Sequence, residues 1–129
     1  MSNDYKIVYN FWFEKIDSKL WFQKSDDFDE QIRKHFLEIH KKACLGELFF
    51  WRESPRGALS EIIVLDQFSR NLYRDSRKAF EVDGMALALS QEAIRRGLDQ
   101  ELLPKEKSFL YMPFMHSESL EIHKEAVEL

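Results

Sequence analysis

The sequence predicts an all-α protein, an antiparallel array of five to six helices that forms a single domain over residues 1–129. Three observations predict this class. The chain has only 4 Gly and 3 Pro, so turn signals are few. Apolar residues recur at helical spacing, and no segment alternates like a half-buried strand. Start and stop signals for helices divide the chain into segments of ordinary helix length.

The first half of the chain contains two of these segments. Asn3 or Asp4 is the expected cap of a helix whose apolar stripe includes Ile7, Val8, Phe11 and Trp12. Residues 15–27 are expected to form a polar and aromatic loop. Asp27, with Glu30 three residues later, resembles a capping box. The helix that follows is expected to run through Cys44 and to end at Gly46; its buried face is Ile32, Phe36, Ile39 and Ala43.

The middle of the chain carries a clear start signal, with Ser54 as cap and Pro55 in the first helical position. A break is expected near residues 75–76, and a new helix over about residues 77–96 that Gly97 ends. Its expected core face is Ala79, Val82, Ala86, Leu89 and Ala93.

The last third of the chain predicts two more helices. One begins at Pro104, and Pro113 should end or kink it because proline cannot donate a backbone hydrogen bond. The final helix is expected from about Ser117 to the end of the sequence.

Charge and cysteine content exclude several classes of protein. The chain has 19 Lys and Arg against 23 Asp and Glu, a net charge of −4, which argues against nucleic-acid binding. No apolar run approaches the length of a membrane span, about 20 residues, and the N-terminus does not resemble a secretory signal. Cys44 is the single cysteine and fits a reducing compartment. We therefore expect a soluble, cytoplasmic protein.

The segment IVLDQFSRNLYRDSRKAF, which starts at Ile63, is apolar at first and then strongly polar. On a helical wheel its polar side chains share one arc of roughly 140°; they are Asp66, Gln67, Arg70, Asn71 and Arg74, here called the polar stripe. Three interpretations stay open. The stripe is a solvated face with an Asp66–Arg70 ion pair, the lining of a cleft in which arginine captures an anion, or a buried structural network.

Three motifs carry a resemblance to a known family. They are YNFWF near the start, LDQFSRNLYRDSRKAFEVD in the middle and FLYMPFMHSESL near the end. In this order they resemble the bacterial domain-of-unknown-function family 924, which implies a tetratricopeptide-repeat-like helical fold and no established activity. The positions that match the family pattern are Asp66, Gln67, Phe68, Arg70, Asn71, Asp83, His116, Ser117 and Glu118.

The sequence also departs from that family pattern. Ser69 stands where the pattern has proline, and His123 where it often has glutamine. Family members usually continue past this end through another Arg-, His- and Asn-containing segment, so the chain looks short at its C-terminus. The last helix would then leave apolar surface uncovered, which predicts a homo-oligomer through that helix or reduced stability.

Candidate catalytic residues are His116, Glu118 and Asp66. His116 and Glu118 are expected at a helix start after Pro113, where His116 could act as a general base with Glu118 or Asp66; the alternative is a histidine that holds a turn. His116 and His123 would lie two turns apart, roughly 10 Å, which is too far to share a metal ion. No metal and no cofactor are predicted.

Two functional hypotheses follow from these residues. The first is a binding or scaffold module that holds a small anionic ligand or peptide. The predicted ligand-binding residues are Gln67, Arg70, Asn71, Arg74 and, from the aromatic cluster, Trp51. The second is a small-molecule enzyme that uses His116 and Glu118 with Asp66 and Arg70, with hydrolysis as the candidate reaction. The absence of a recognisable nucleophile or metal motif favours the first.

Overall fold

The computed structural model describes residues 4–129, and every regular element within them is helical. The α-helices are α1 (Lys6–Asn10), α2 (Asp26–Cys44), α3 (Pro55–Ile63), α4 (Ser69–Leu72), α5 (Asp83–Arg95), α6 (Pro104–His116) and α7 (Leu120–Val127). π-Helical segments follow α1 (Phe11–Lys15) and join α3 to α4 (Val64–Phe68). Short 3-10 segments lie at Ser18–Trp21, Phe49–Glu53, Arg77–Phe80 and Leu98–Glu101. The predicted all-α class is confirmed; the tetratricopeptide-like arrangement stays a prediction.

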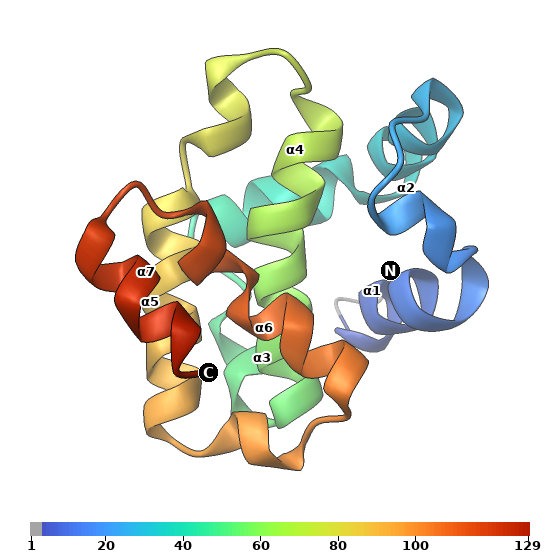
Figure 1. Cartoon of the computed structure of the whole chain (residues 1–129). Helices are drawn as coiled ribbons and strands as arrows, with labels where there is room; N and C mark the ends of the chain where they lie inside the picture. The colour runs from blue at the N-terminus through green and yellow to red at the C-terminus, as the bar shows by residue number, and fades with distance from the viewer. Residues whose placement is uncertain (1–3) are drawn as a thin grey trace.

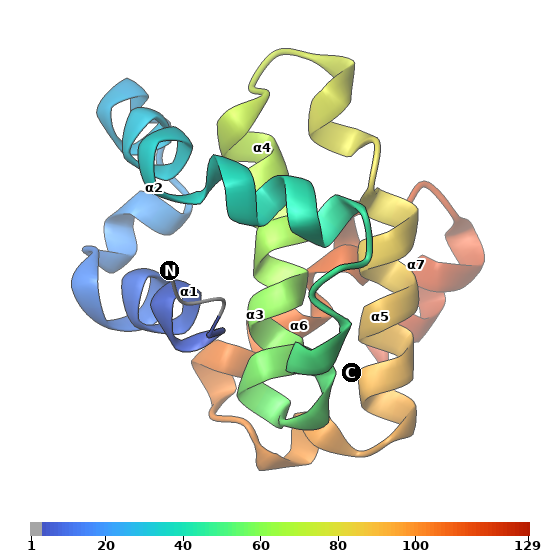
Figure 2. The same ribbon diagram turned by 180° about the vertical axis from the view of Figure 1, so that it is seen from behind.

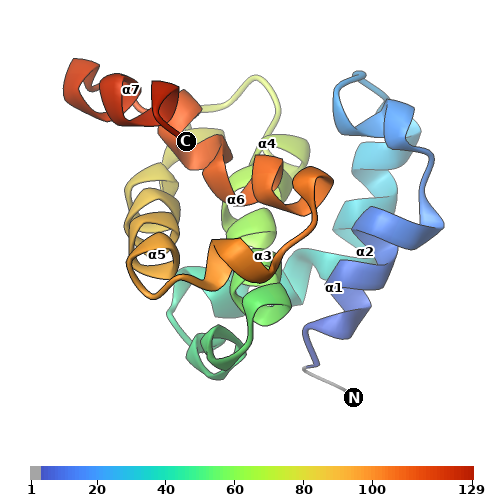
Figure 3. The ribbon, with the colours of Figure 1, turned by 60° about the horizontal axis from the view of Figure 1, so that its bottom comes forward.

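A long central helix, here called the rod, is the element on which the other helices pack (Figure 1). It consists of α3, the π-helical segment and α4, which continue one another from Pro55 to Leu72. Helices α1, α2, α5 and α6 pack around it, as Figure 3 shows with the bottom of the molecule turned forward. Every residue from 57 to 69 is buried. The apolar character of the first part of this helix therefore reflects packing on several sides.

Helix α2 crosses the rod on the far side (Figure 2) and packs on α4. Its expected buried face, which includes Ile32 and Phe36, is confirmed, and so is its end near Gly46, where φ is +75°. The predicted cap at Asp27 is wrong. Ser25 caps the helix, because its side chain already accepts the Phe28 N–H at 3.2 Å.

Two other predicted boundaries need correction. Helix α5 begins at Asp83, since residues 77–80 form a separate 3-10 segment. Helix α6 runs through Pro113 to His116, so the expected end at Pro113 is wrong. Pro113 is buried, and the Ser90 hydroxyl donates to the Leu110 carbonyl in the turn before it at 2.5 Å. The missing amide would have donated to the Phe109 carbonyl, and the packing of the buried proline ring offsets the loss of that bond.

Two other predicted helix starts, those of α3 and α1, can be compared with the structure. The Ser54 side chain accepts the Gly57 N–H at 3.1 Å and Pro55 opens α3. Of the two proposed first caps, Asp4 accepts the Lys6 N–H at 2.9 Å, and Asn3 lies outside the described residues.

Helix α7 lies at the periphery, where it packs against α6 (Figure 3). It starts after Ser119 rather than Ser117, because the Ser119 side chain caps it. None of its residues is buried, and Leu120 and Val127 are 77% and 88% exposed. Within residues 4–129, no helix has both the length and the apolar character needed to cross a membrane.

Candidate functional site

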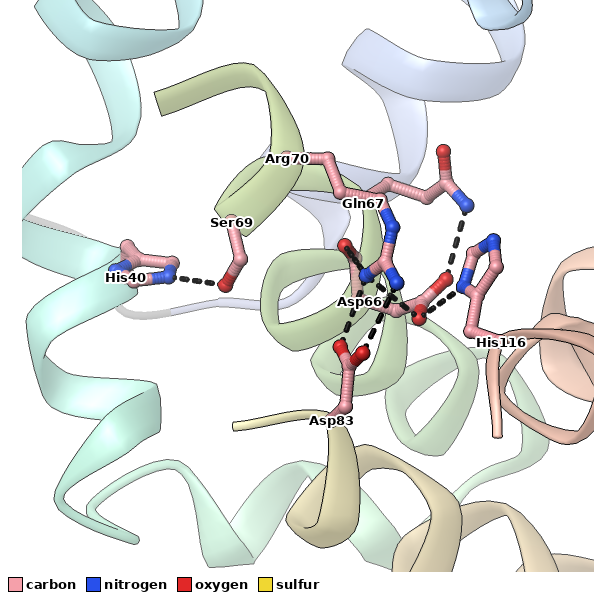
Figure 4. A network of polar contacts seen from close by, with 7 residues as sticks. All are labelled: His40, Asp66, Gln67, Ser69, Arg70, Asp83 and His116. Carbon is pink, nitrogen blue, oxygen red and sulfur yellow. Dashed lines mark hydrogen bonds and ion pairs between the residues drawn. The ribbon is translucent and has the colours of Figure 1, made fainter. Parts of the chain in front are cut away.

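Asp66 is the centre of a polar network inside the fold (Figure 4). It lies on the π-helical segment of the central rod and is 1% exposed. One carboxylate oxygen, Oδ1, accepts from Arg70 at 3.2 Å and from His116 Nδ1 at 2.8 Å. The other, Oδ2, accepts from the Gln67 amide at 2.9 Å. The π-helix is a rare local geometry that often accompanies functional sites.

Arg70 connects this carboxylate to helix α5. Its guanidinium donates to both oxygens of Asp83 at 2.9 and 3.0 Å, and also to the main-chain oxygen of Asp66 at 3.0 Å. The ring of Phe80 lies 5.3 Å from the guanidinium carbon and is 57% exposed. Two carboxylates, Asp66 and Asp83, pair with this one guanidinium, so the cluster has no excess of positive charge while both pairs are in place.

His116 is the last residue of α6 rather than the first of a helix, contrary to the sequence prediction. It approaches Asp66 from an element 50 positions away in sequence. A carboxylate can only accept, so Nδ1 donates to Asp66. When the imidazole is neutral, its lone pair is then on Nε2, which Figure 4 shows turned away from Asp66. Within residues 4–129, His116 Nε2 has no hydrogen-bond partner.

A cavity of about 510 Å³ opens beside this network. Its polar lining comes from Arg70, Asp83, His116, Ser117 and Glu118, and Phe80 is part of its apolar wall. Glu118 is exposed and lies in the short connection between α6 and α7. The structure thus brings the three candidate catalytic residues to one place: Asp66 behind His116, and Glu118 at the rim of the cavity.

The rest of the predicted polar stripe forms a separate network. Asn71 donates to Asp29 at 2.8 Å, and Arg74 binds the same carboxylate through two nitrogens at 2.7 and 3.0 Å. Burial raises the pKa of the Asp29 carboxyl, but the hydrogen bonds from Arg74 and Asn71 outweigh it and hold that pKa below its usual range. These contacts tie α4 to α2.

The structure also separates Trp51 from the other predicted ligand-binding residues. Trp51 is 2% exposed and lies in the 3-10 segment before α3. From Pro55 to Asp66 the rod spans roughly 16 Å, so Trp51 lies at its other end. Gln67 is buried and holds Asp66. Of the three interpretations of the polar stripe, the solvated face is wrong for Asp66 and Gln67, which are both buried.

Two further residues of this region were missed as site candidates. Asp83 was seen only as part of the family pattern, although an acidic residue at a helix start is a visible signal. Ser69 contacts His40 on the opposite side of α4 (Figure 4), with 2.7 Å between Oγ and Nε2. Nothing in the sequence relates these two residues, which are 29 positions apart. Within the part of the chain that the structure describes, no group of three His, Cys, Asp or Glu side chains could hold a metal.

Fold and network together define an all-α protein in which a buried aspartate holds a histidine and an arginine at the wall of a cavity. The chain belongs to a family of bacterial proteins of unknown function, DUF924, whose model matches residues 8–129. It is similar to the solved structure of a protein of unknown function from Agrobacterium tumefaciens, with 32% sequence identity and a TM-score of 0.91. That similarity covers 96% of this chain and 70% of the other. No curated protein matches the sequence.

Proposed function

We propose that this chain binds a small polar molecule in the cavity beside His116, where His116 acts as a general base. The observation that carries the proposal is the hydrogen bond between His116 Nδ1 and the buried Asp66 carboxylate. Such a bond fixes the tautomer and orientation of an imidazole and leaves its other nitrogen to accept a proton. Gln67 and Arg70 in turn hold the carboxylate in place.

The cavity suits a small molecule better than a peptide. Its volume of about 510 Å³ is within the usual range for small-ligand sites, about 300–1,000 Å³. Glu118 at the rim and Ser117 beside His116 supply further polar groups. With no recognisable nucleophile, the reaction would be hydrolysis, in which His116 takes a proton from the attacking water and the bond to the leaving group breaks, or a proton transfer from the ligand to His116. The cytoplasmic location belongs to the same proposal.

A panel of chromogenic nitrophenyl esters, phosphates and anilides tests this role. We expect turnover of at least one class to fall by about 10²- to 10⁴-fold in His116→Asn. Glu118→Gln should have a smaller effect. The matched control is Glu38→Gln, which changes an exposed carboxylate on α2 away from the cavity. Equal turnover rates for the wild type and His116→Asn, with both proteins folded, would rule out His116 as a general base.

The second candidate is the binding or scaffold role for an anionic ligand or peptide. One observation favours it: Arg70 lines the cavity, 23% of its side chain is exposed, and Phe80 adds an apolar wall. A ligand anion would have to displace Asp83 from the guanidinium. Inorganic phosphate and acetate, followed by NMR shifts of the Gly84 amide, distinguish the two roles. Arg70→Lys should weaken anion binding and His116→Asn should not.

A further inference from the structure

A second cavity lies on the other side of α4 from His116. The end of α2 and residues 73–82 form its walls, and its volume is about 350 Å³. Figure 4 shows His40, one of its lining residues, on the opposite side of the helix from Asp83 and His116. Leu45, Tyr73 and Val82 make its surface largely apolar. An apolar cavity of this size with a few polar groups is typical of a small-molecule site.

The polar groups inside this cavity carry no charge. His40 is 5% exposed, and its Nε2 is 2.7 Å from the fully buried Ser69 hydroxyl. Burial lowers the pKa of His40, so its imidazole is neutral. Burial also raises the pKa of the Cys44 thiol, and Glu81 adds to this, so the sulfur stays protonated. The interior therefore suits the uncharged, apolar part of a ligand.

Cys44 is part of the wall rather than a nucleophile. Its sulfur lies 3.7 Å from His40 Nδ1 and 3.8 Å from Nε2. Nearly equal distances to both nitrogens mean that the thiol does not point along the lone pair of either one, as proton transfer to a base requires.

The charged groups at this cavity have a positive excess. Lys41 and Lys78 line it, against the single carboxylate of Glu81. The ammonium of Lys41 is also 3.5 Å from Glu38 in an exposed pair, and that of Lys78 lies 5.6 Å from the centre of the Tyr73 ring. Exposed lysines on flexible stems can reorient toward a ligand anion at little cost.

We propose that this cavity binds a small apolar carboxylic acid. The hydrocarbon or aromatic part occupies the space between Leu45, Tyr73 and Val82. The carboxylate stays at the opening, where Lys41 and Lys78 neutralise it. This site is separate from the cavity of His116 and does not depend on the function proposed there.

The single cysteine of the chain provides a direct test, because Cys44 is partly exposed and lines the cavity. The measurement is the rate at which iodoacetamide alkylates Cys44 in the presence of phenylacetate or of its neutral analogue phenylacetamide. We expect phenylacetate to slow alkylation in a saturable way. Phenylacetamide should need about fivefold or more higher concentration for the same protection.

Three variants separate the possible outcomes. The double change Lys41→Gln with Lys78→Gln should remove the preference for phenylacetate. Lys34→Gln, an exposed charge elsewhere on α2, is the matched control and should keep it. His116→Asn should also keep it. The proposal is overturned if neither probe protects Cys44, if both protect equally well, or if Lys34→Gln weakens phenylacetate binding as much as the double change.

Discussion

Replacement of Asp66 by asparagine tests whether the buried network stabilises the fold. In the wild type, the carboxylate accepts three hydrogen bonds, two on Oδ1 and one on Oδ2. Asparagine keeps the shape but has one acceptor oxygen. If that oxygen faces Arg70 and His116, the new NH₂ group faces Gln67, whose amide can rotate to present its own oxygen. The variant then keeps the hydrogen bonds from Arg70 and His116 but loses the negative charge of their acceptor.

The size of this loss follows from the number of bonds. A hydrogen bond to a charged group contributes about 1.5–3 kcal/mol and a neutral one about 0.5–1.5 kcal/mol. Two such changes cost about 2 kcal/mol in free energy of unfolding. Asp66→Ala removes every acceptor and leaves buried donors unpaired, at a cost of about 3–5 kcal/mol. For 129 residues, 1 kcal/mol corresponds to about 4 °C in Tm.

Thermal unfolding followed by circular dichroism, together with urea titration, measures both variants. We expect Tm to fall by about 8 °C for Asp66→Asn and by about 12–20 °C for Asp66→Ala. Glu38→Gln, from an exposed pair at 3.5 Å, should change stability by less than about 0.5 kcal/mol. If Asp66→Asn has the same Tm as the wild type and the Glu38→Gln control, the carboxylate does not stabilise the fold and the expected loss is refuted.

Four further predictions concern pH, packing and association. Since the folded pKa of Asp29 is depressed, its stabilisation should be lost as the pH falls below the ordinary value of 3.8, and urea titrations of Asp29→Asn should lack that part of the acid slope. Since burial lowers the folded pKa of His40, the protein should lose stability as the pH falls below 6.5, the ordinary pKa of histidine. Urea titrations of His40→Gln should lack this dependence. Gly57→Ala should lower Tm by about 4–12 °C, because the new Cβ would lie 2.0 Å from the Trp51 carbonyl oxygen. If the chain self-associates through α7, as we propose, Leu120→Lys should shift light scattering toward the monomer mass.

Local signals predicted the helices well where one residue decides the geometry. Pro55 after Ser54 sets the start of α3, and Gly46 and Gly97 adopt the left-handed conformation that ends a helix. The errors arise where signals compete. Ser25 and Asp27 are both good caps, and only the structure shows that the serine side chain reaches the Phe28 N–H.

Pro113 shows the limit of local rules in another way. Its sequence context predicts a break, but α6 continues to His116 because the fold buries the proline. This one error moved His116 from the end of a helix to the start of the next in the sequence interpretation. The candidate residue was identified, and its position was wrong, because tertiary packing outweighs the propensity of one residue.

The polar stripe shows why the site could be found only in part. A helical wheel correctly placed Asp66 and Arg70 four positions apart on one face, and they form the expected ion pair at 3.2 Å. It could not show what covers that face, because Asp83 and His116 join it from 13 and 50 positions away. Those distant partners turn an apparent surface stripe into a buried network.

Neighbouring residues of α4 also contact different partners that lie far from them in sequence. Ser69 contacts His40 on α2, which lines one cavity, whereas Arg70 contacts Asp83 on α5 and lines the other. Ser69 also replaces the proline of the family pattern, and proline has no hydroxyl to meet the buried imidazole. A relative with proline at this position must satisfy or replace that histidine in another way. The buried imidazole is therefore bound by a residue that departs from the family pattern, whereas the contacts of Asp66 rest on residues that match it.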